Sequence, residues 1–172
     1  MDGIQNRKCT ADDLVDLKEI SISTFLDTYA HLNTSENVEK HLKHAFNDEQ
    51  LLSEILDPEI AFYFFYNNQE LCGYIKLCWG RAQSEVMVNE YVEVERIYVV
   101  KAHHRKGIGR YMIDLARSKT KKLNKSKLWL GVWKKNPEAV EFYKKVGFKI
   151  FGEHTFNVGN DVQSDWMMEL DI

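Results

Sequence analysis

Two short segments of the sequence carry residue types and spacings on which chemistry could depend. In the first, Glu93 and Glu95 stand on a predicted strand that leads into a loop of glycines and basic side chains ending at Arg110. A glycine-bearing loop that opens a helix presents backbone N–H groups to an anion, and lysine and arginine side chains add positive charge. The segment therefore predicts a cradle for a diphosphate.

The loop differs from the two common phosphate-binding motifs. It has neither the G-x-x-x-x-G-K-[ST] order of a P-loop nor the G-x-G-x-x-G order of a dinucleotide fingerprint. Taken alone, Gly107 and Gly109 in a basic loop are explained equally well as a way to begin a helix.

The second segment runs from Asn136 to Phe148. Asn136 before Pro137 is a good helix start, and Gly147 is a good stop. Tyr143 follows Asn136 by seven residues, two helical turns, so both side chains can face one cleft. A capped helix with a core aromatic is the plainer explanation of this segment.

The sequence predicts both helices and strands, and these elements must position the two segments. Helical periodicity and capping residues predict helices over about 10–29, 35–46, 48–57, 108–124 and 136–146, with Ser35 capping the second. Apolar runs, alternation and turn residues predict strands over about 4–8, 60–66, 71–79, 91–100, 128–133, 148–154 and 163–170. We expect an α/β fold, a mixed sheet flanked by helices.

The strand over 91–100 has a simple alternating pattern. Alternation places Glu93, Glu95, Ile97 and Val99 on one face of the sheet. The other face would carry Arg96 and its alternate neighbours. The two glutamates would then face the same way as the residues that lead into the basic loop.

Length and composition fit one globular domain over residues 1–172. Hydrophobic residues make up 44% and charged residues 28% of the chain, a balance typical of folded proteins. No apolar run approaches the roughly 20 residues of a membrane helix, and the first residues do not form a signal peptide. Three cysteines without paired spacing favour a reducing compartment. We expect a cytoplasmic protein without membrane contact.

Net charge argues against a nucleic-acid-binding protein. The formal charge is -3, whereas phosphate-backbone binding depends on clustered Lys and Arg. Mild acidity is compatible with a cationic substrate. His41 and His44 have helical spacing that could hold zinc, but no third ligand is evident, so exposed histidines are favoured and no metal is assigned. His103 and His104 are interpreted as part of a solvated loop.

Together the two segments resemble the GNAT acetyltransferase superfamily. Residues 104–109 fall in the frame [QR]-x-x-G-x-[GA], and residues 136–148 match N-x-x-A-x-x-x-Y-x-x-x-G-F throughout. His104 departs from the usual Gln or Arg, which leaves a backbone cradle intact. The resemblance implies a mostly antiparallel twisted sheet of about seven strands, whose splayed fourth and fifth strands hold acetyl-CoA.

The resemblance also implies which positions contact the cofactor. Pantetheine would pair with the strand backbone, the pyrophosphate would lie on the basic loop, and the helix after Asn136 would touch the cofactor. The implied positions are Ile97, Tyr98, Val99, His104, Arg105, Lys106, Gly107, Ile108, Gly109, Arg110, Asn136, Glu138, Tyr143 and Lys145.

Family chemistry is direct attack of a neutral amine on the thioester. Tyr143 is expected to protonate the departing thiolate as general acid. Glu93 is the first choice for the base that deprotonates the ammonium, and Glu95 is the second. Either glutamate could instead simply pair with neighbouring cations. The Val99 N–H could polarise the thioester carbonyl.

A closer resemblance, to PaiA-type polyamine acetyltransferases, extends over nearly the whole chain. It rests on residues 23–28, 82–85, 95–98 and 128–133. Polyamine binding needs spaced carboxylates and aromatic faces. The candidates are Phe25, Tyr29, Glu36, Glu85 and Trp133, although a phenylalanine such as Phe25 is more often a core residue.

Other functions remain open on sequence alone. The acceptor could be a protein N-terminus, a lysine, an amino sugar or a small xenobiotic amine. A CoA-binding regulator without turnover is an alternative from a different class. The family resemblance leaves a homodimer possible.

Overall fold

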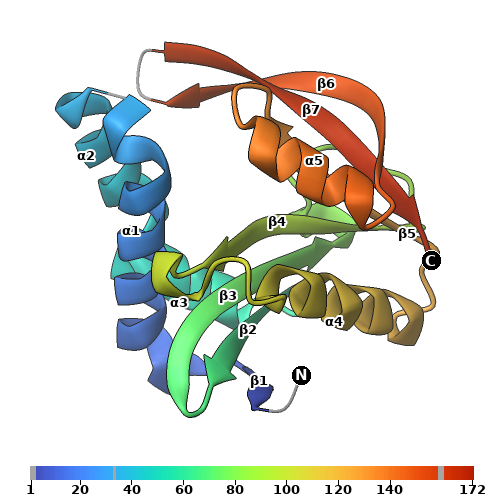
Figure 1. Cartoon of the computed structure of the whole chain (residues 1–172), viewed down its shortest axis with the longest axis horizontal. Helices are drawn as coiled ribbons and strands as arrows, with labels where there is room; N and C mark the ends of the chain where they lie inside the picture. The colour runs from blue at the N-terminus through green and yellow to red at the C-terminus, as the bar shows by residue number, and fades with distance from the viewer. Residues whose placement is uncertain (1–2, 33, 159–160) are drawn as a thin grey trace.

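A single seven-stranded sheet forms the centre of the protein in the computed structural model, which describes residues 3–32, 34–158 and 161–172 (Figure 1). The strand order is β1-β2-β3-β4-β5-β7-β6. The strands are β1 (Ile4–Lys8), β2 (Ile60–Asn67), β3 (Glu70–Trp79), β4 (Tyr91–Val99), β5 (Lys127–Trp133), β6 (Lys149–Val158) and β7 (Asp161–Asp171). β4 and β5 run parallel, and the other neighbouring pairs are antiparallel. The predicted mixed sheet is confirmed.

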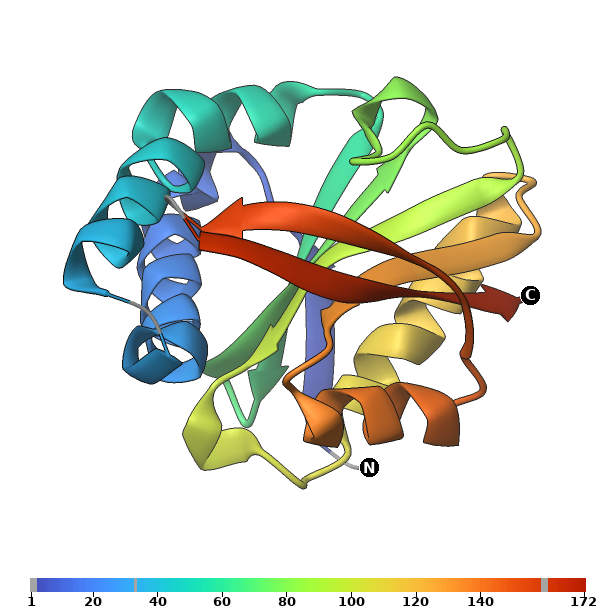
Figure 2. The same ribbon diagram turned by 90° about the horizontal axis from the view of Figure 1, so that it is seen from above.

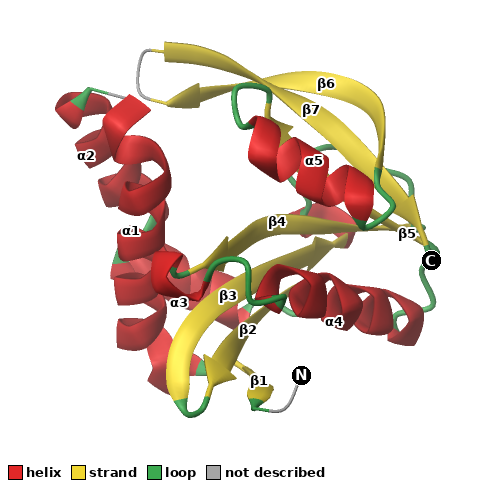
Figure 3. Cartoon of the chain, in the orientation of Figure 1, coloured by secondary structure: helices red, strands yellow, loops and turns green. Residues whose placement is uncertain are grey.

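Helices cover both faces of this sheet (Figure 3). They are α1 (Leu14–Tyr29), α2 (Ser35–Ala45), α3 (Asp48–Leu56), α4 (Ile108–Lys122) and α5 (Pro137–Lys145). Helices α1 to α3 bury Leu17, Phe25 and Leu51 in one apolar cluster, whereas α4 and α5 bury Met112 and Val140 in another. The N-cap of α2 is Thr34 rather than the predicted Ser35.

The parallel strands β4 and β5 separate partway along their length. Their pairing runs from Tyr91 opposite Lys127 to Glu93 opposite Trp129. β4 then continues to Val99 and β5 to Trp133 with no further ladder pairs between them in the described chain. Figure 2 shows from above how β4 and β5 diverge. The predicted splay is confirmed, and it exposes strand edges that a continuous sheet would pair.

A β-bulge in β4 overturns the predicted alternation. Lys76 of β3 pairs with Arg96, but the next residue, Leu77, pairs with Val94, so Glu95 has no position of its own in the ladder. An extra residue on one strand shifts the side-chain period by one. Val94 and Ile97 therefore pack in the same cluster as α4. Glu93 consequently does not share a face with Ile97, and the predicted alternation is wrong beyond Glu95.

Within the described residues, no helix combines the length and apolar character that crossing a bilayer requires. The same residues contain no group of three or more His, Cys, Asp or Glu side chains arranged to hold a metal ion.

Candidate active site

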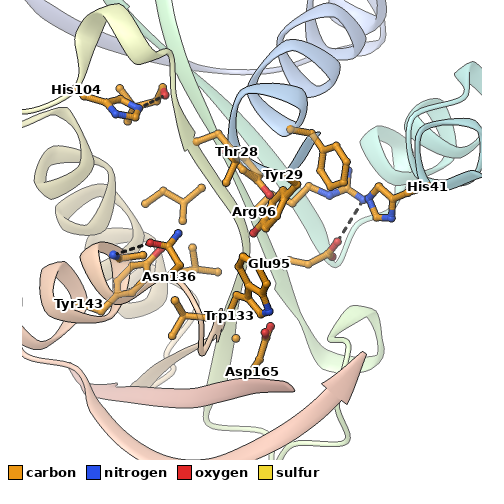
Figure 4. A pocket seen from close by; sticks show the side chains of 18 of the residues that line it. Thr28, Tyr29, His41, Glu95, Arg96, His104, Trp133, Asn136, Tyr143 and Asp165 are labelled. Atoms are coloured by element: carbon orange, nitrogen blue, oxygen red, sulfur yellow. Dashed lines mark hydrogen bonds and ion pairs between the residues drawn. The ribbon is translucent and has the colours of Figure 1, made fainter. Parts of the chain in front are cut away.

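A cavity of about 470 Å³ lies where β4 and β5 separate (Figure 4). Its walls come from α1 and α2, the second half of β4 and the loop after it, the end of β5, one side of α5, and one residue of β7. The strand divergence creates this space because no ladder fills the gap between Val94 and Trp133. It brings residues from both chemistry-bearing segments of the sequence to one place.

Tyr143 and Asn136 both line the cavity from α5. The Asn136 side chain accepts a hydrogen bond from the Ala139 N–H at 3.1 Å and so begins the helix. Two turns later Tyr143 is 8% exposed. Burial, with a smaller contribution from Tyr29, raises the pKa of the Tyr143 phenol well above its ordinary value. Tyr143 thus keeps its proton at neutral pH.

Glu93 is held away from the cavity. Its carboxylate accepts hydrogen bonds from the Ser84 N–H at 2.6 Å and from the Ser84 hydroxyl. The residue is 3% exposed and is absent from the cavity lining. Burial raises the pKa of Glu93 to about 7, although the Ser84 hydrogen bonds oppose the shift.

Glu95 lines the cavity but is engaged by two cations. Its carboxylate lies 2.6 Å from Lys76 Nζ and 3.4 Å from an Arg96 nitrogen. Both cations also pair with Glu54, at 2.9 Å and 3.3 Å. Burial alone would raise the pKa of Glu95, but Arg96 and Lys76 outweigh it and lower the pKa. Glu95 is therefore a carboxylate that resists protonation.

The predicted substrate residues divide into two groups. Phe25, Tyr29 and Trp133 line the cavity, with ring centroids 5.0 Å apart for Phe25 and Tyr29 and 6.1 Å apart for Tyr29 and Trp133. Glu36 is exposed on α2 and pairs with Lys40, and Glu85 lies beside His154. The structure places neither glutamate in the cavity lining.

The predicted cofactor positions on β4 also reach the cavity. Ile97, Tyr98, Val99 and His104 line it, and His104 Nε2 lies 2.7 Å from the Val99 carbonyl oxygen. This hydrogen bond ties the loop back to the strand that it leaves. His103, by contrast, is 5% exposed, so the interpretation of both histidines as solvated was wrong for His103.

The basic loop leads to the N-terminus of α4 in an unusual backbone conformation. Arg105 has φ of 61° and Gly107 has φ of 81°, and the first N–H groups of a helix have no intrahelical acceptor. The remaining predicted cofactor positions lie on this loop, on the first turn of α4 or on the surface of α5. They are Arg105, Lys106, Gly107, Ile108, Gly109, Arg110, Glu138 and Lys145.

Sequence reasoning missed three ionisable residues of the cavity: His41, Arg96 and Asp165. His41 stacks on Phe25 at 4.4 Å, and burial, with Arg96 and His44, lowers the pKa of His41 to about 4. Arg96 lies on the face of β4 that also carries Tyr98, and both side chains line the cavity. Asp165 lies far along the chain from both motifs, and no local pattern singles it out.

Comparisons with known proteins agree with this geometry. Residues 21–148 match the acetyltransferase (GNAT) family. The chain is 36% identical over 169 residues, 98% of each chain, to an uncharacterized N-acetyltransferase of Lactobacillus delbrueckii subsp. lactis. It is 28% identical, over 86% of this chain and 89% of the other, to the spermidine N(1)-acetyltransferase of Thermoplasma acidophilum.

A solved structure is similar along the whole chain. The PaiA N-acetyltransferase of Thermoplasma acidophilum, crystallised with coenzyme A, has a TM-score of 0.80 and 26% identity, covering 98% of this chain and 99% of that one. The predicted family, fold and cofactor are thereby confirmed. This chain belongs to the GNAT acetyltransferase family and is an acetyl-CoA-dependent N-acetyltransferase.

Proposed function

We propose that the acceptor amine is a polyamine such as spermidine or spermine. The observation that carries this proposal is the cavity wall, where Phe25, Tyr29 and Trp133 stand beside the carboxylates of Glu95 and Asp165. Aromatic faces bind cations and methylene chains, and carboxylates attract ammonium groups. The spermidine N(1)-acetyltransferase relative supports the same acceptor.

We propose direct transfer, with Tyr143 as general acid. The amine nitrogen attacks the thioester carbonyl carbon, the C–S bond breaks, and the Tyr143 O–H protonates the departing thiolate. The second amine proton then returns to the phenolate. A buried phenol with a raised pKa holds its proton at neutral pH, so it can donate that proton to the sulfur as negative charge develops there.

Acetyl-CoA supplies the acetyl group and the thiolate leaving group. The unpaired edge of β4 at Ile97 to Val99 suits the pantetheine amides, and the loop from Arg105 to Arg110 suits the pyrophosphate, because a helix N-terminus and basic side chains both favour anions. The Val99 N–H is the proposed donor to the carbonyl oxygen.

Glu93 and Glu95 differ in how well each could act as the base. Glu93 has a pKa suited to accepting a proton near neutrality, but Ser84 holds its carboxylate outside the cavity lining. Glu95 lines the cavity, but its two cations make it a weak base. A base role for either glutamate stays a prediction, and Glu95 is better suited to holding charge near the amine.

We propose a cytoplasmic location, since Cys9, Cys72 and Cys78 are all free thiols and all buried. Free thiols persist in reducing compartments. A homodimer stays a prediction.

An amine panel tests the proposed acceptor. Purified protein would receive acetyl-CoA with spermidine, spermine, a monoamine of similar length, a lysine peptide and an amino sugar, and CoA release would be followed with product mass spectrometry. We expect kcat/KM for a polyamine to exceed that of the monoamine by about tenfold or more. Preference for another amine would overturn the polyamine assignment, and CoA binding without any turnover would favour a regulator.

A further inference from the structure

Asp165 of β7 lines the cavity between β4 and β5. In the strand register it lies opposite Trp133 of β5 on one side and His154 of β6 on the other. Its side chain is 14% exposed and lines the same cavity as Tyr143. Figure 4 shows the Asp165 carboxylate beside the Trp133 indole, apart from the Glu95 and Arg96 group.

Two further side chains connect Asp165 with the surface. His154 Nε2 lies 3.7 Å from Asp165 Oδ2, and His154 Nδ1 lies 3.0 Å from Glu85 Oε1. Both contacts have ion-pair distances but not hydrogen-bond geometry. Exposure rises outward along this series, from 14% for Asp165 and 19% for His154 to 41% for Glu85. A carboxylate, an imidazole and a second carboxylate therefore lead from the cavity to solvent.

Gly131 of β5 makes room for this arrangement. A Cβ atom at that position would lie 3.2 Å from Asp165 Oδ2 and 3.3 Å from His154 Nε2. Contacts of this length are tighter than side chains ordinarily accept, so a larger residue would move both groups. The absence of a side chain on Gly131 thus lets the aspartate and histidine lie together against the strand that borders the cavity.

We propose that Asp165 is the catalytic base that deprotonates the acceptor ammonium, and that His154 and Glu85 pass the proton to solvent. Asp165 would touch substrate and is a catalytic residue in that sense. His154 and Glu85 act through it and are positioning residues. The proposal rests on the acetyltransferase activity of the family but not on the acceptor being a polyamine.

The reaction releases one proton per turnover, and this route accounts for it. The ammonium loses one N–H proton to an Asp165 oxygen, and the neutral nitrogen then attacks the thioester. The second amine proton goes to the Tyr143 phenolate and replaces the proton that Tyr143 gave to the thiolate. One proton per turnover is left on Asp165. It passes outward when the His154 imidazole closes the 3.7 Å gap to Asp165 Oδ2. No oxidant or additional reactant is needed.

The electrostatic surroundings of Asp165 suit a base that works near neutral pH. Burial raises the pKa of Asp165 to about 6, while His154 and then Lys134 oppose the shift. The groups facing it are His154 from β6, Lys134 after β5 and Tyr29 from α1. Across the cavity stand Glu95 and Arg96 of β4, which pair with each other, and His41 of α2 and Tyr143 of α5.

Asp165 is better suited to act as the base than either of the two strand glutamates. A proton acceptor works best when its pKa is near the working pH and it reaches the proton directly. Glu95 has the contact but a lowered pKa, and Glu93 has a raised pKa but lies outside the cavity lining. Asp165 has both properties.

The test compares Asp165→Asn with Asp171→Asn, the same change at an exposed position of the same strand. We expect Asp165→Asn to lower kcat/KM for the amine by roughly 10²–10⁴ at pH 7, with the affinity for CoA unchanged. In wild type, kcat/KM should rise with pH through about 6 as Asp165 loses its proton. This rise should be absent in Asp165→Asn and present in Glu93→Gln and Asp171→Asn.

A second measurement distinguishes a base from a structural residue. An amine of lower pKa, such as a fluorinated analogue of the best substrate, has a larger neutral fraction at pH 7 and needs less help from a base. The defect of Asp165→Asn should therefore shrink with the fluorinated amine, and it should also shrink as pH rises. His154→Gln and Glu85→Gln should produce smaller losses with the same dependence on amine pKa.

The results separate this proposal from the acceptor assignment. If wild type acetylates amines other than polyamines, the polyamine proposal fails and the base is tested with the amine that reacts. If Asp165→Asn matches Asp171→Asn, or if its defect is equal for both amines and at all pH values, Asp165 is not the base. Loss of the rise near pH 6 in Glu93→Gln alone would return the role to Glu93.

Discussion

Lys76 and Glu95, which lines the cavity, form an ion pair of 2.6 Å, and the Lys76 side chain is only 3% exposed. Lys76 lies 2.9 Å from Glu54 as well, and Arg96 pairs with both carboxylates. Two cations and two anions thus neutralise one another between α3 and the bulged part of β4. The bulged residue Glu95 and its neighbour Arg96 both belong to this cluster.

Replacing Lys76 with Met should destabilise the protein strongly. Removal of one cation leaves two buried carboxylates with only Arg96, and breaking a buried ionic group in this way typically costs about 3–5 kcal/mol. Chemical denaturation would measure the loss. The exposed pair of Lys40 and Glu36 offers the control, since Lys40→Met should cost less than about 1 kcal/mol. A similar small loss in Lys76→Met would mean that water replaces the missing cation.

Replacing Tyr143 with Phe should reduce turnover without weakening cofactor binding. The variant keeps the buried ring but lacks the proton that the thiolate needs, so kcat should fall by roughly 10²–10⁴. Tyr63→Phe is a matched control, because Tyr63 is 7% exposed in the core beneath α4 and does not line the cavity. Stopped-flow turnover and CoA titration would be compared for both variants. Full activity in Tyr143→Phe would remove the phenol from the chemistry.

Replacing Glu93 with Gln should change how stability depends on pH. Burial raises the pKa of Glu93 to about 7 from 4.5, so the folded protein binds this proton more tightly than the unfolded chain. The stabilisation is fully present below about pH 4.5 and is lost as pH rises through about 7. Relative to wild type, Glu93→Gln should therefore gain up to about 3 kcal/mol between pH 5 and 8.

Urea denaturation at several pH values would measure this difference. Glu141→Gln, at an exposed position of α5, should show no such trend between pH 5 and 8. A flat difference for Glu93→Gln as well would indicate that Ser84 stabilises the ionised carboxylate enough to cancel the effect of burial.

Much of the fold follows from local sequence signals. Strand alternation, Asn136 as a cap and Gly147 as a stop locate the elements closely, because each depends on neighbours within a few residues. The paired motifs bring Asn136, Tyr143 and the strand 91–99 to one cavity for the same reason. Local signals therefore suffice to locate these elements and to single out Asn136 and Tyr143.

The proposed acceptor side depends on tertiary geometry that local patterns do not encode. The bulge at Glu95 arises from the register of β3 on β4. Alternation alone therefore assigns Glu93 and Arg96 to opposite faces, although the ladder places both on the same face. Asp165 enters the cavity because β7 is inserted between β5 and β6 in the sheet. The sequence order of the strands gives no indication of that insertion, and a lone aspartate on a strand has no distinctive neighbours.

Gly107 provides a test of the backbone cradle that spares every charged side chain. Its φ of 81° at the start of α4 lies in the left-handed region, where a Cβ costs roughly 1–2 kcal/mol. Gly107→Ala should relieve this strain by rotating the first N–H groups of α4, so the affinity for CoA should fall about fivefold to thirtyfold. Isothermal titration would measure it, with kcat for the amine at saturating cofactor little changed.

Gly152→Ala is the control for this change, because a Cβ there would meet Met167 at 3.5 Å, an ordinary contact, in β6 and away from the loop. It should bind CoA as wild type does. Unchanged affinity in Gly107→Ala, with a loss of stability, would mean that the helix terminus tolerates the rotation. In that case Arg105, Lys106 and Arg110 would hold the pyrophosphate by charge, and the affinity should instead fall steeply as ionic strength rises.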